Sequence, residues 1–471
     1  MKVLLISPTY ITEKISTTMD DVHLAMERKP PLGLLSLAAY LGEQSAHDVT
    51  ILDNQLERHD DDALAAYLAK LDPRVVGITV VSFKLWEAYQ VSCLVRRALP
   101  GAHIVWGGPH LSIYPNESLA LDCVDSIVLE DGERPLLELC DRLERGDDPE
   151  GIAGLYTRRN IPAEGNFVGA FNADLNALPL IDLTKVRYGE YKAYLTGNQM
   201  ATVLTSRGCP FRCIFCRLDT RKIRLSSVER VIEQIKSYVA LGVREVEFYD
   251  ETFNTTTVRV KEFATRLMDE KIDIRWSFRG RIDRVDEEML RAIKAAGCQR
   301  IQYGVEAGTD KVLNNLRKGT SVEQIRRCFK LTNKVGIDTV AYLILGSPGE
   351  TLDDMRQTID LVREIRPTYI EYAIFNLSPG TQAYQMALDQ GVLESDVWRD
   401  YAADPSGAMP VRVWDKDYSF DELEKMRQKA LKSFYLSPRY IFSRLVNMRP
   451  SEAVMTFKTG AKFIKKLALN A

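Results

Sequence analysis

Two series of short apolar runs, each alternating with amphipathic runs, constrain the fold of this 471-residue chain more than any other feature. The first series has apolar runs at 2–7, 48–53, 75–82, 103–108 and 124–133, with helical spacing between them. Because parallel strands need a crossover connection, this alternation predicts a doubly wound, Rossmann-like sheet covered by helices. No G-x-G-x-x-G follows the first run, so the sequence does not predict a dinucleotide site.

Ligands of such sheets bind at the carboxyl ends of the strands. In the first series these ends read Ser7-Pro8-Thr9, Asp53-Asn54, Ser82-Phe83, Gly107-Gly108-Pro109-His110 and Asp131-Gly132-Glu133. The sequence therefore predicts that a ligand of the first domain contacts these segments.

The second series has strand candidates at 200–206, 244–250, 273–278, 300–306, 338–346 and 369–380. Six strand–helix repeats over about 190 residues are typical of a partial (β/α)6 TIM-like barrel, whose chemistry lies at the carboxyl ends of its strands. Polar residues or glycine stand at those ends, namely Asp250, Glu251, Arg279, Glu306 and Gly346. We expect an α/β protein with a Rossmann-like domain at 1–140, a linker at 141–195, a barrel at 196–385 and a helical C-terminal segment at 386–471.

Composition narrows the class of protein. The net charge is −3, which is not the basic surplus of a general nucleic-acid binder, and 45% of the residues are hydrophobic. No run approaches the ~18 apolar residues of a membrane span, and 2–7 is too short for a secretory signal. We therefore expect a cytoplasmic protein whose eight cysteines are thiols or metal ligands.

The C-terminal segment turns basic after Arg439, and only Glu452 opposes its lysines and arginines. A helix at 456–470 would carry Phe457, Phe463 and Leu467 among lysines. Such a helix suits weak contact with a membrane surface or with an anionic substrate, but a solvated or partner-docking role is the more common one for a segment of this kind.

Three cysteines lie in the twelve residues "TSRGCPFRCIFC" (205–216), directly after the first strand of the second series. Cys209, Cys213 and Cys216 have the spacing C-x3-C-x2-C. Thiolates bind zinc or iron–sulfur clusters, but a closed zinc site wants four ligands and no fourth Cys or His is near. A [4Fe-4S] cluster held by three cysteines keeps one iron open for a small ligand.

This spacing, after the first strand of a barrel, resembles the signature of the radical S-adenosylmethionine superfamily. The resemblance implies that the open iron chelates S-adenosylmethionine, with Phe215 near its adenine. The stretch "YDETF" with Asp250 and Glu251 resembles the segment that binds the methionine amino group. "GVEAG" with Glu306 resembles a ribose- or carboxylate-binding strand end, and "GSPGET" with Gly346 resembles the loop beside the adenine. Arg279 and Arg281 each have two possible roles. Each would contact a carboxylate of the cofactor or substrate, or would pair with a neighbouring acidic residue.

The first domain is similar to the cobalamin-binding domain found before many radical S-adenosylmethionine barrels. The resemblance rests on "PLGLLSLAAYL", "VGITVVS", "WGGPH" and "DGE". It implies cobalamin contacts from Ser82, Gly107, Gly108, His110, Gly132 and Glu133. The cobalamin motif D-x-H-x-x-G is absent, which leaves the lower axial ligand of cobalt unassigned. His110 would either face the corrin or only form hydrogen bonds within its own loop. Gly107 and Gly108 would either contact cobalamin or only allow the turn in which they lie.

The two resemblances imply a cobalamin-dependent radical enzyme, in the first place a methyltransferase. A 5′-deoxyadenosyl radical would abstract hydrogen from an unactivated carbon of a small-molecule or lipid-like substrate, and methylcobalamin would donate the methyl group. The electron would come from a donor such as flavodoxin or ferredoxin. The sequence identifies neither a catalytic residue nor the substrate.

Three alternatives remain at this point. An oxidative cyclase or ring-rearranging enzyme would use the same cofactors without methyl transfer. A tRNA methylthiotransferase would need a second cluster in the first domain, yet Cys93, Cys123 and Cys140 lie in or at the end of helical runs. A non-enzymatic metal-binding module would leave the polar strand ends without a purpose.

Overall fold

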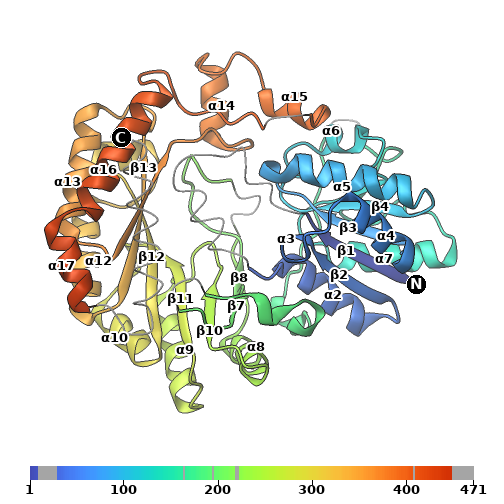
Figure 1. The fold of residues 1–471 in the computed structure, drawn as a ribbon, viewed down its shortest axis with the longest axis horizontal. Coiled ribbons are helices and arrows are strands. Elements are labelled where there is room, and N and C mark those ends of the chain that lie inside the picture. Colours follow the sequence, from blue (N-terminus) through green and yellow to red (C-terminus); the bar gives the residue numbers. More distant parts are fainter. Residues whose placement is uncertain (9–28, 163–164, 194–195, 218–221, 407–408, 448–471) are drawn as a thin grey trace. The chain divides into compact units, whose positions relative to one another are not determined.

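The structure is a computed structural model of the chain, and it describes residues 1–8, 29–162, 165–193, 196–217, 222–406 and 409–447. The chain divides into two compact units, which Figure 1 shows in the colours of the sequence. Met1–Tyr191 and Ser395–Pro410 form the first unit, and Lys192–Glu394 and the chain from Val411 form the second. The chain thus passes between units at three places, after residues 191, 394 and 410.

The first unit is built on a six-stranded sheet in the order β2-β1-β3-β4-β5-β6. The strands are β1 (Lys2–Ser7), β2 (Asp48–Asp53), β3 (Val75–Thr79), β4 (His103–Gly107), β5 (Ser126–Val128) and β6 (Leu155–Thr157). The first five are parallel, and β6 pairs antiparallel with β5. The strand β6 comes from the segment that the sequence marked as a linker, so part of that segment completes the first sheet.

Helices cover this sheet as the alternation predicts. They are α2 (Leu32–Gln44), α3 (Asn54–Glu57), α4 (Asp61–Leu71), α5 (Leu85–Ala98), α6 (Pro115–Ala120) and α7 (Glu133–Arg145), and a 3-10 turn spans Ser82–Lys84. The helix α2 packs against α7, and α4 packs against α5. The linker adds 3-10 turns at Leu175–Ala177, Leu183–Lys185 and Tyr188–Glu190.

The second unit contains a six-stranded, all-parallel sheet in the order β14-β13-β12-β11-β10-β7. Its strands are β7 (Met200–Val203), β10 (Glu245–Phe248), β11 (Arg275–Gly280), β12 (Cys298–Glu306), β13 (Asp338–Leu345) and β14 (Tyr369–Ile374). Strand order equals chain order, as in a barrel, and within the described residues β7 and β14 remain edges. The expected partial (β/α)6 barrel is confirmed.

Helices of the second unit form a layer over one face of its sheet, as Figure 1 shows for α9, α10, α12 and α13. The layer contains α8 (Val228–Ala240), α9 (Thr257–Asp269), α10 (Glu287–Ala295), α12 (Val322–Val335) and α13 (Leu352–Ile365), and the unit also contains α11 (Asp310–Asn315) and α14 (Gln382–Asp389). Phe248, Phe253, Phe263, Trp276 and Phe278 form one aromatic cluster between this layer and the sheet. Since successive side chains of a strand alternate, the opposite face of the sheet is left for a site.

The C-terminal segment is helical, as expected, with α15 (Val397–Ala403), α16 (Phe420–Tyr435) and α17 (Pro438–Asn447). The helix α16 packs on β14, and the Tyr435 hydroxyl donates to the Ile370 carbonyl at 2.9 Å and accepts from its N–H at 3.0 Å. These bonds occupy backbone groups of an edge strand that would otherwise attract another chain. The predicted basic helix at 456–470 lies outside the described residues.

Candidate functional site

The cysteine loop is the stretch 208–223 between β8 (Ser206–Arg207) and β9 (Arg224–Leu225), which pair antiparallel at its base. Asp250, at the end of β10, is fully buried beneath this base. Its carboxylate accepts from the Thr205 N–H at 3.1 Å, from the Thr205 hydroxyl at 2.9 Å, and from the Ser206 hydroxyl. Burial raises the pKa of Asp250, and these hydrogen bonds oppose that rise.

Arg259 of α9 completes the base of the loop. Its guanidinium donates to the Thr205 hydroxyl at 3.2 Å and to the Ser226 carbonyl at 2.9 Å, and its charge also favours the ionised form of Asp250. The hydrogen bonds of Asp250 and Arg259 hold the two chain ends of the cysteine loop. The expected contact of Asp250 with the cofactor stays a prediction.

None of the three motif cysteines forms a disulfide; Cys209 is buried, and Cys213 and Cys216 are half-buried. In the described part of the chain, no three His, Cys, Asp or Glu side chains are grouped closely enough to hold one metal ion. The donor set, three thiolates at C-x3-C-x2-C spacing, fits a [4Fe-4S] cluster that takes each cysteine on a different iron.

Two backbone hydrogen bonds hold the middle of the loop. The Ile214 N–H donates to the Leu316 carbonyl at 3.1 Å, and the Ala383 N–H donates to the Ile214 carbonyl at 2.9 Å. The Cys209 thiol lies 3.8 Å from the Thr252 hydroxyl. The loop is thus attached to segments at several strand ends, as a cluster site requires if its ligands are to be held in advance.

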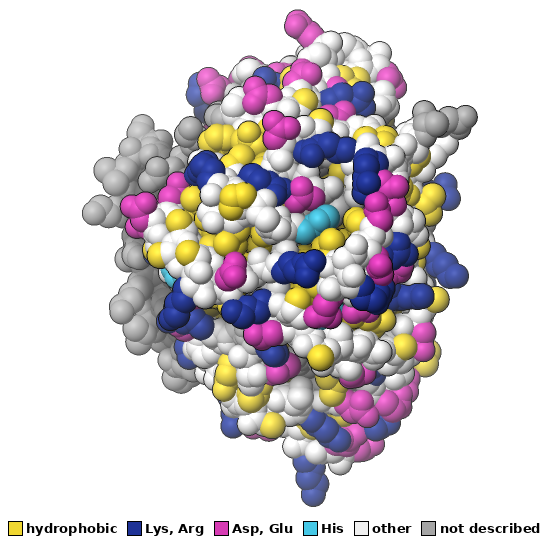
Figure 2. Space-filling view, turned by 90° about the vertical axis from the view of Figure 1, so that its right-hand side faces the viewer, with side chains coloured by type: hydrophobic (Ala, Val, Ile, Leu, Met, Phe, Trp, Pro, Cys, Tyr) yellow, Lys and Arg dark blue, Asp and Glu magenta, His cyan; other side chains and the backbone are white. Residues whose placement is uncertain are grey.

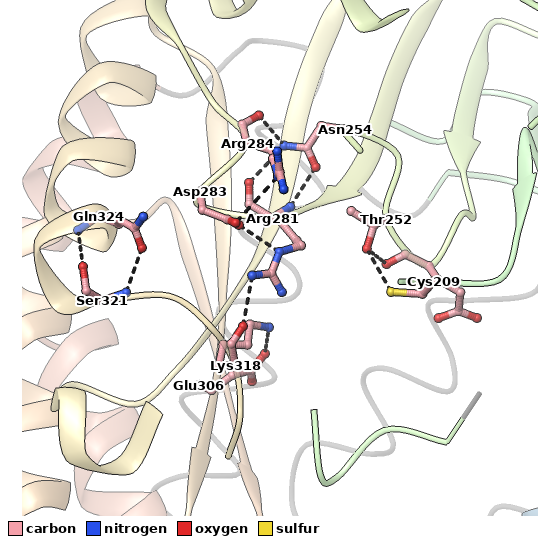
Figure 3. A network of polar contacts seen from close by, with 11 residues as sticks. Cys209, Thr252, Asn254, Arg281, Asp283, Arg284, Glu306, Lys318, Ser321 and Gln324 are labelled. Atoms are coloured by element: carbon pink, nitrogen blue, oxygen red, sulfur yellow. Dashed lines mark hydrogen bonds and ion pairs between the residues drawn. The ribbon is translucent and has the colours of Figure 1, made fainter. Parts of the chain in front are cut away.

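Arg281, just after β11, ties three segments together beside the loop (Figure 3). Its guanidinium donates to Asp283 at 2.8 Å and to the Lys318 carbonyl at 3.0 Å, and it lies 3.6 Å from the ring centroid of Phe211. Asn254 accepts from the Arg281 N–H and donates to its carbonyl. Arg281 therefore pairs with a neighbouring acid, which was one of its two expected roles.

Glu306, at the end of β12, forms an ion pair of 2.6 Å with Lys318. Its φ of 64° is unusual for a residue other than glycine, and the β12–β13 register shifts between Gly304 and Glu306. A Cβ on Gly304 would lie 2.6 Å from the Lys318 ammonium, so a side chain there would displace the charged ends of this pair. Backbone strain of this kind is concentrated at functional sites.

The aromatic residue of the motif lies near this pair, because the Lys318 ammonium is 5.9 Å from the ring centroid of Phe215. Burial raises the pKa of the Cys213 thiol, while the charges of Lys318 and Arg281 lower it. Lys318 thus lies between Glu306 and Phe215 of the cysteine loop.

The other predicted residues of the second unit are placed differently. Glu251 is exposed beside Asp250, and the Arg279 guanidinium lies 4.3 Å from the ring centroid of Tyr249. Gly346 has φ 79°, and a Cβ there would lie 2.6 Å from Leu423 of α16. Gly346 therefore serves the packing of α16 in this structure, and its expected contact with the cofactor stays a prediction.

A polar chain crosses the inner face of the barrel sheet, opposite the helices. Gln302 of β12 donates to buried Glu247 of β10 at 3.2 Å and accepts from the Tyr342 hydroxyl of β13 at 3.0 Å. In closed barrels this face is filled by branched apolar side chains. A polar inner face is instead suited to a polar ligand, and Arg279 and Tyr249 extend from the same face.

In the first unit, the loops after β3 and β4 contain four predicted residues. His110 is fully buried, and its Nδ1 lies 3.0 Å from the hydroxyl of buried Ser82. Gly108 has φ 116°, and a Cβ there would lie 2.6 Å from the Val80 carbonyl oxygen. A side chain on Gly107 would meet no atom within 4 Å. Open space therefore lies at the carboxyl end of β4, which fits the approach of a large ligand to the backbone.

Gly132 and Glu133 stand at the start of α7. A Cβ on Gly132 would lie 3.1 Å from Leu37 of α2. Buried Glu133 accepts from the Ser36 hydroxyl and from the Asn172 amide, each at 2.7 Å. Glu133 thus joins two helices to the linker, and its expected cobalamin contact stays a prediction.

Sequence reasoning missed Lys318 and Arg259. Both come from helical or turn segments far along the chain from the cysteines, so spacing gave no sign of them. A weak signal existed for Lys318, because the "RKGT" turn follows a short helix directly after the "GVEAG" strand end.

Side chains of both signs share the surface. On the described part of the face shown in Figure 2, Lys, Arg, Asp and Glu are interspersed, with apolar side chains scattered among them. No helix among the described residues is long and apolar enough to cross a membrane.

Two family models match the chain in the regions where the two sites lie. The radical SAM superfamily model matches residues 203–362, which contain the cysteine loop, Glu306 and Lys318. The B12 binding domain model matches residues 26–140, which contain the loops after β3 and β4.

Relatives and solved structures agree with both matches. An uncharacterized methyltransferase of Pyrococcus horikoshii is 30% identical over 450 residues, 94% of each chain. An anaerobic magnesium-protoporphyrin IX monomethyl ester cyclase of Rubrivivax gelatinosus is 25% identical over 374 residues, 76% of this chain and 66% of the cyclase. The structure of the radical S-adenosylmethionine methyltransferase TsrM from Kitasatospora setae, with cobalamin and a [4Fe-4S] cluster bound, has a TM-score of 0.67 at 21% identity, covering 83% of this chain and 75% of TsrM. This chain belongs to the radical S-adenosylmethionine superfamily, in the group whose barrel follows a B12-binding domain.

Proposed function

We propose that the protein is a cobalamin-dependent radical S-adenosylmethionine methyltransferase that places a methyl group on an unactivated carbon of a small-molecule or lipid-like substrate. The observation that carries this proposal is the three-cysteine loop at the carboxyl end of the first barrel strand, in a chain whose other unit is a B12-binding domain. The methyltransferase relative at 30% identity supports methyl transfer over other uses of these cofactors.

When bound, the cluster with S-adenosylmethionine supplies a carbon-centred radical, and the cobalamin supplies the methyl group. The residues of the chain do the remaining work. Cys209, Cys213 and Cys216 would hold the cluster, and Phe215 and Glu306 are our candidates for contact with S-adenosylmethionine. Asp250 and Arg259 fix the loop, so that its ligands do not have to be reorganised at each turnover.

The inner face of the barrel sheet is our candidate for the place where the substrate binds. Arg279 presents a cation there, and Glu247, Gln302 and Tyr342 present hydrogen-bonding groups. A substrate with a carboxylate or other polar handle would be oriented by this face while its apolar carbon is presented to the radical. Comparison of metabolites from cells with and without the enzyme by untargeted mass spectrometry would identify the substrate by a gain of one methyl group.

The cyclase relative keeps a second function open, in which the same cofactors close a ring without methyl transfer. The two functions differ in their products. Methyl transfer yields S-adenosylhomocysteine together with 5′-deoxyadenosine, whereas cyclisation yields no S-adenosylhomocysteine.

We further propose that a flavodoxin or ferredoxin reduces the cluster in a reducing cytoplasm. None of the eight cysteines forms a disulfide, which is compatible with a reducing compartment. Formation of 5′-deoxyadenosine with purified flavodoxin and its reductase would support this, and failure of both carriers where dithionite succeeds would contradict it.

Weak contact with a membrane surface is the last part of this proposal. The predicted helix at 456–470 lies outside the described residues, but α17 directly before it carries the exposed side chains Ile441, Phe442, Leu445 and Val446. Apolar side chains next to a basic segment favour an anionic lipid surface. Sedimentation with phosphatidylglycerol vesicles should fall when residues 448–471 are removed, and equal sedimentation would dismiss the contact.

A further inference from the structure

A short C-terminal segment belongs to the first unit although the chain on either side of it belongs to the second. Ser395–Pro410 joins the first unit, and its helix α15 packs against α6 (Figure 1). The chain therefore leaves the second unit after Glu394 and returns to it at Val411. Nothing in the hydrophobic pattern of the C-terminal segment predicts this.

Trp398 is the apolar anchor of the segment. Its side chain is fully buried, and its ring meets the edge of Phe83 at a centroid distance of 5.6 Å, with the ring planes 88° apart. Phe83 lies in the turn Ser82–Lys84, at the carboxyl end of β3. Tyr401 and Ala402, on the same helix, are also buried. One contact of α15 thus falls on the loop after β3.

Asp396 supplies the polar anchor. Its carboxylate accepts from the Tyr114 hydroxyl at 2.9 Å and caps α15 by accepting from the Arg399 N–H at 3.1 Å. The Tyr114 ring lies beside the His110 ring, with centroids 5.7 Å apart, and Tyr114 donates its N–H to the His110 carbonyl at 3.2 Å. The second contact of α15 thus falls on the loop after β4.

The two contacted loops are also bonded to each other. Ser82 and His110 approach to 3.0 Å, and the His110 N–H donates to the Val80 carbonyl at 3.3 Å. A continuous set of contacts therefore runs from Trp398 and Asp396 to the backbone beside Gly107 and Gly108. Carboxyl ends of parallel strands are where such sheets bind their ligands.

We propose that residues 395–403 are a structural part of the cobalamin site, and that Trp398, Asp396 and Tyr114 are positioning residues that hold the loops after β3 and β4 in the shape that binds the corrin. This inference rests on the proposed use of cobalamin by the first unit. The inference goes beyond that proposed use because it assigns part of the cobalamin site to a segment that begins at Ser395. The B12-binding match ends at residue 140, about 255 residues earlier.

The physical reason is pre-organisation. Loops at strand ends lose conformational freedom when they bind a large ligand, and contacts that order them in advance reduce that cost. Burying an indole and pairing a phenol with a carboxylate both order these loops before the cofactor arrives. Removal of either contact should therefore weaken cobalamin binding without removing any atom from the binding surface.

The test uses the full chain and hydroxocobalamin, with dissociation constants measured by ultrafiltration and absorbance. Tyr114→Phe removes the hydroxyl and keeps the ring, and we expect binding about threefold to tenfold weaker. Trp398→Ala removes the anchor, and we expect binding at least about tenfold weaker. The control is Asp400→Asn on the same helix, at an exposed side chain, and we expect less than about a twofold change.

A second readout separates positioning from general destabilisation. The electron paramagnetic resonance spectrum of bound cob(II)alamin should change in Tyr114→Phe and stay unchanged in Asp400→Asn. Meanwhile the iron content and unfolding midpoint of Tyr114→Phe should match the wild type. If Trp398→Ala fails to fold, Tyr114→Phe decides alone.

Wild-type affinity and an unchanged spectrum in Tyr114→Phe would overturn the inference. The proposed function is tested by a different result, because a wild-type protein that binds no cobalamin would contradict that function itself.

Discussion

The Lys318 ammonium lies 2.6 Å from the Glu306 carboxylate, and the two side chains are only 11% and 8% exposed. A buried pair of this kind is strongly destabilised when one partner is removed, because the other charge remains buried and unpaired. We predict that Lys318→Met lowers the free energy of unfolding by about 3 kcal/mol.

The matched experiment is a double-mutant cycle. The double variant Glu306→Gln with Lys318→Met should be more stable than Lys318→Met alone, because no unpaired charge remains. Arg326→Met removes one partner of an exposed ion pair with Glu364 and should change urea unfolding by less than about 1 kcal/mol. Additive single losses would contradict the coupling of Lys318 with Glu306.

Asp250 offers a test of how the cysteine loop is held. The Asp250 carboxylate accepts hydrogen bonds from the N–H and the hydroxyl of Thr205. In Asp250→Asn, one carboxylate oxygen is replaced by an NH2 group, whose hydrogens would point at such donors. We predict that Asp250→Asn lowers the free energy of unfolding by about 1–3 kcal/mol and lowers the iron content after reconstitution. Glu251→Gln, at the exposed neighbour, should retain wild-type stability. Equal iron content in both variants would show that Asp250 does not fix the loop.

The cysteine loop itself is tested by iron analysis and visible absorbance. Cys213→Ala should abolish the charge-transfer absorbance of the reconstituted cluster, because one iron loses its thiolate. The control is Cys298→Ala on β12, which removes a fully buried thiol outside the loop and should keep the cluster. Full cluster content in Cys213→Ala would contradict the assignment of Cys213 as a cluster ligand.

Glu350 makes stability depend on pH. Burial raises its pKa from 4.5 to about 7, against the hydrogen bonds that it accepts from the Ser347 and Gly346 N–H groups. The folded chain therefore holds a proton that the unfolded chain releases between these pH values. The contribution of this group to stability is fully present below pH 4.5 and is lost as the pH rises through about 7.

We predict that Glu350→Gln removes up to about 3 kcal/mol of this pH dependence. The measurement is urea unfolding at pH 5 and pH 8, with each variant compared with the wild type at the same pH. Asp353→Asn, at an exposed carboxylate on α13, should follow the wild type. An equal decline with pH in wild type and Glu350→Gln would rule out Glu350 as its source.

The order of elements could be predicted from the sequence because the second sheet is parallel throughout and the first is parallel except for β6. A buried parallel strand such as 75–79 is a continuous apolar run, and its crossover helix has its own period. The cysteine motif could be predicted because its spacing is local. The residues that contact the cysteine loop could not be predicted, because Arg259 and Lys318 come from segments whose patterns are those of any surface helix or turn.

The structure adds hydrogen-bond partners that the sequence could not predict for several strand-end residues. Asp250, His110 and Glu133 are buried and bonded to neighbouring segments, and their expected ligand contacts stay predictions. Sequence position places a residue at a strand end, but burial and hydrogen-bond partners decide whether it meets a ligand or holds the loop that does. The docking of 395–410 on the first unit was unreadable for a related reason, because Trp398 looks like any core aromatic.

The most direct test of the central claim is product analysis of the reconstituted protein under anaerobic conditions, with S-adenosylmethionine, cobalamin and a reductant. A cobalamin-dependent radical methyltransferase should form both 5′-deoxyadenosine and S-adenosylhomocysteine, the first lost in Cys213→Ala and the second lost without cobalamin. Formation of 5′-deoxyadenosine alone, with S-adenosylhomocysteine absent at every cobalamin concentration, would contradict methyl transfer.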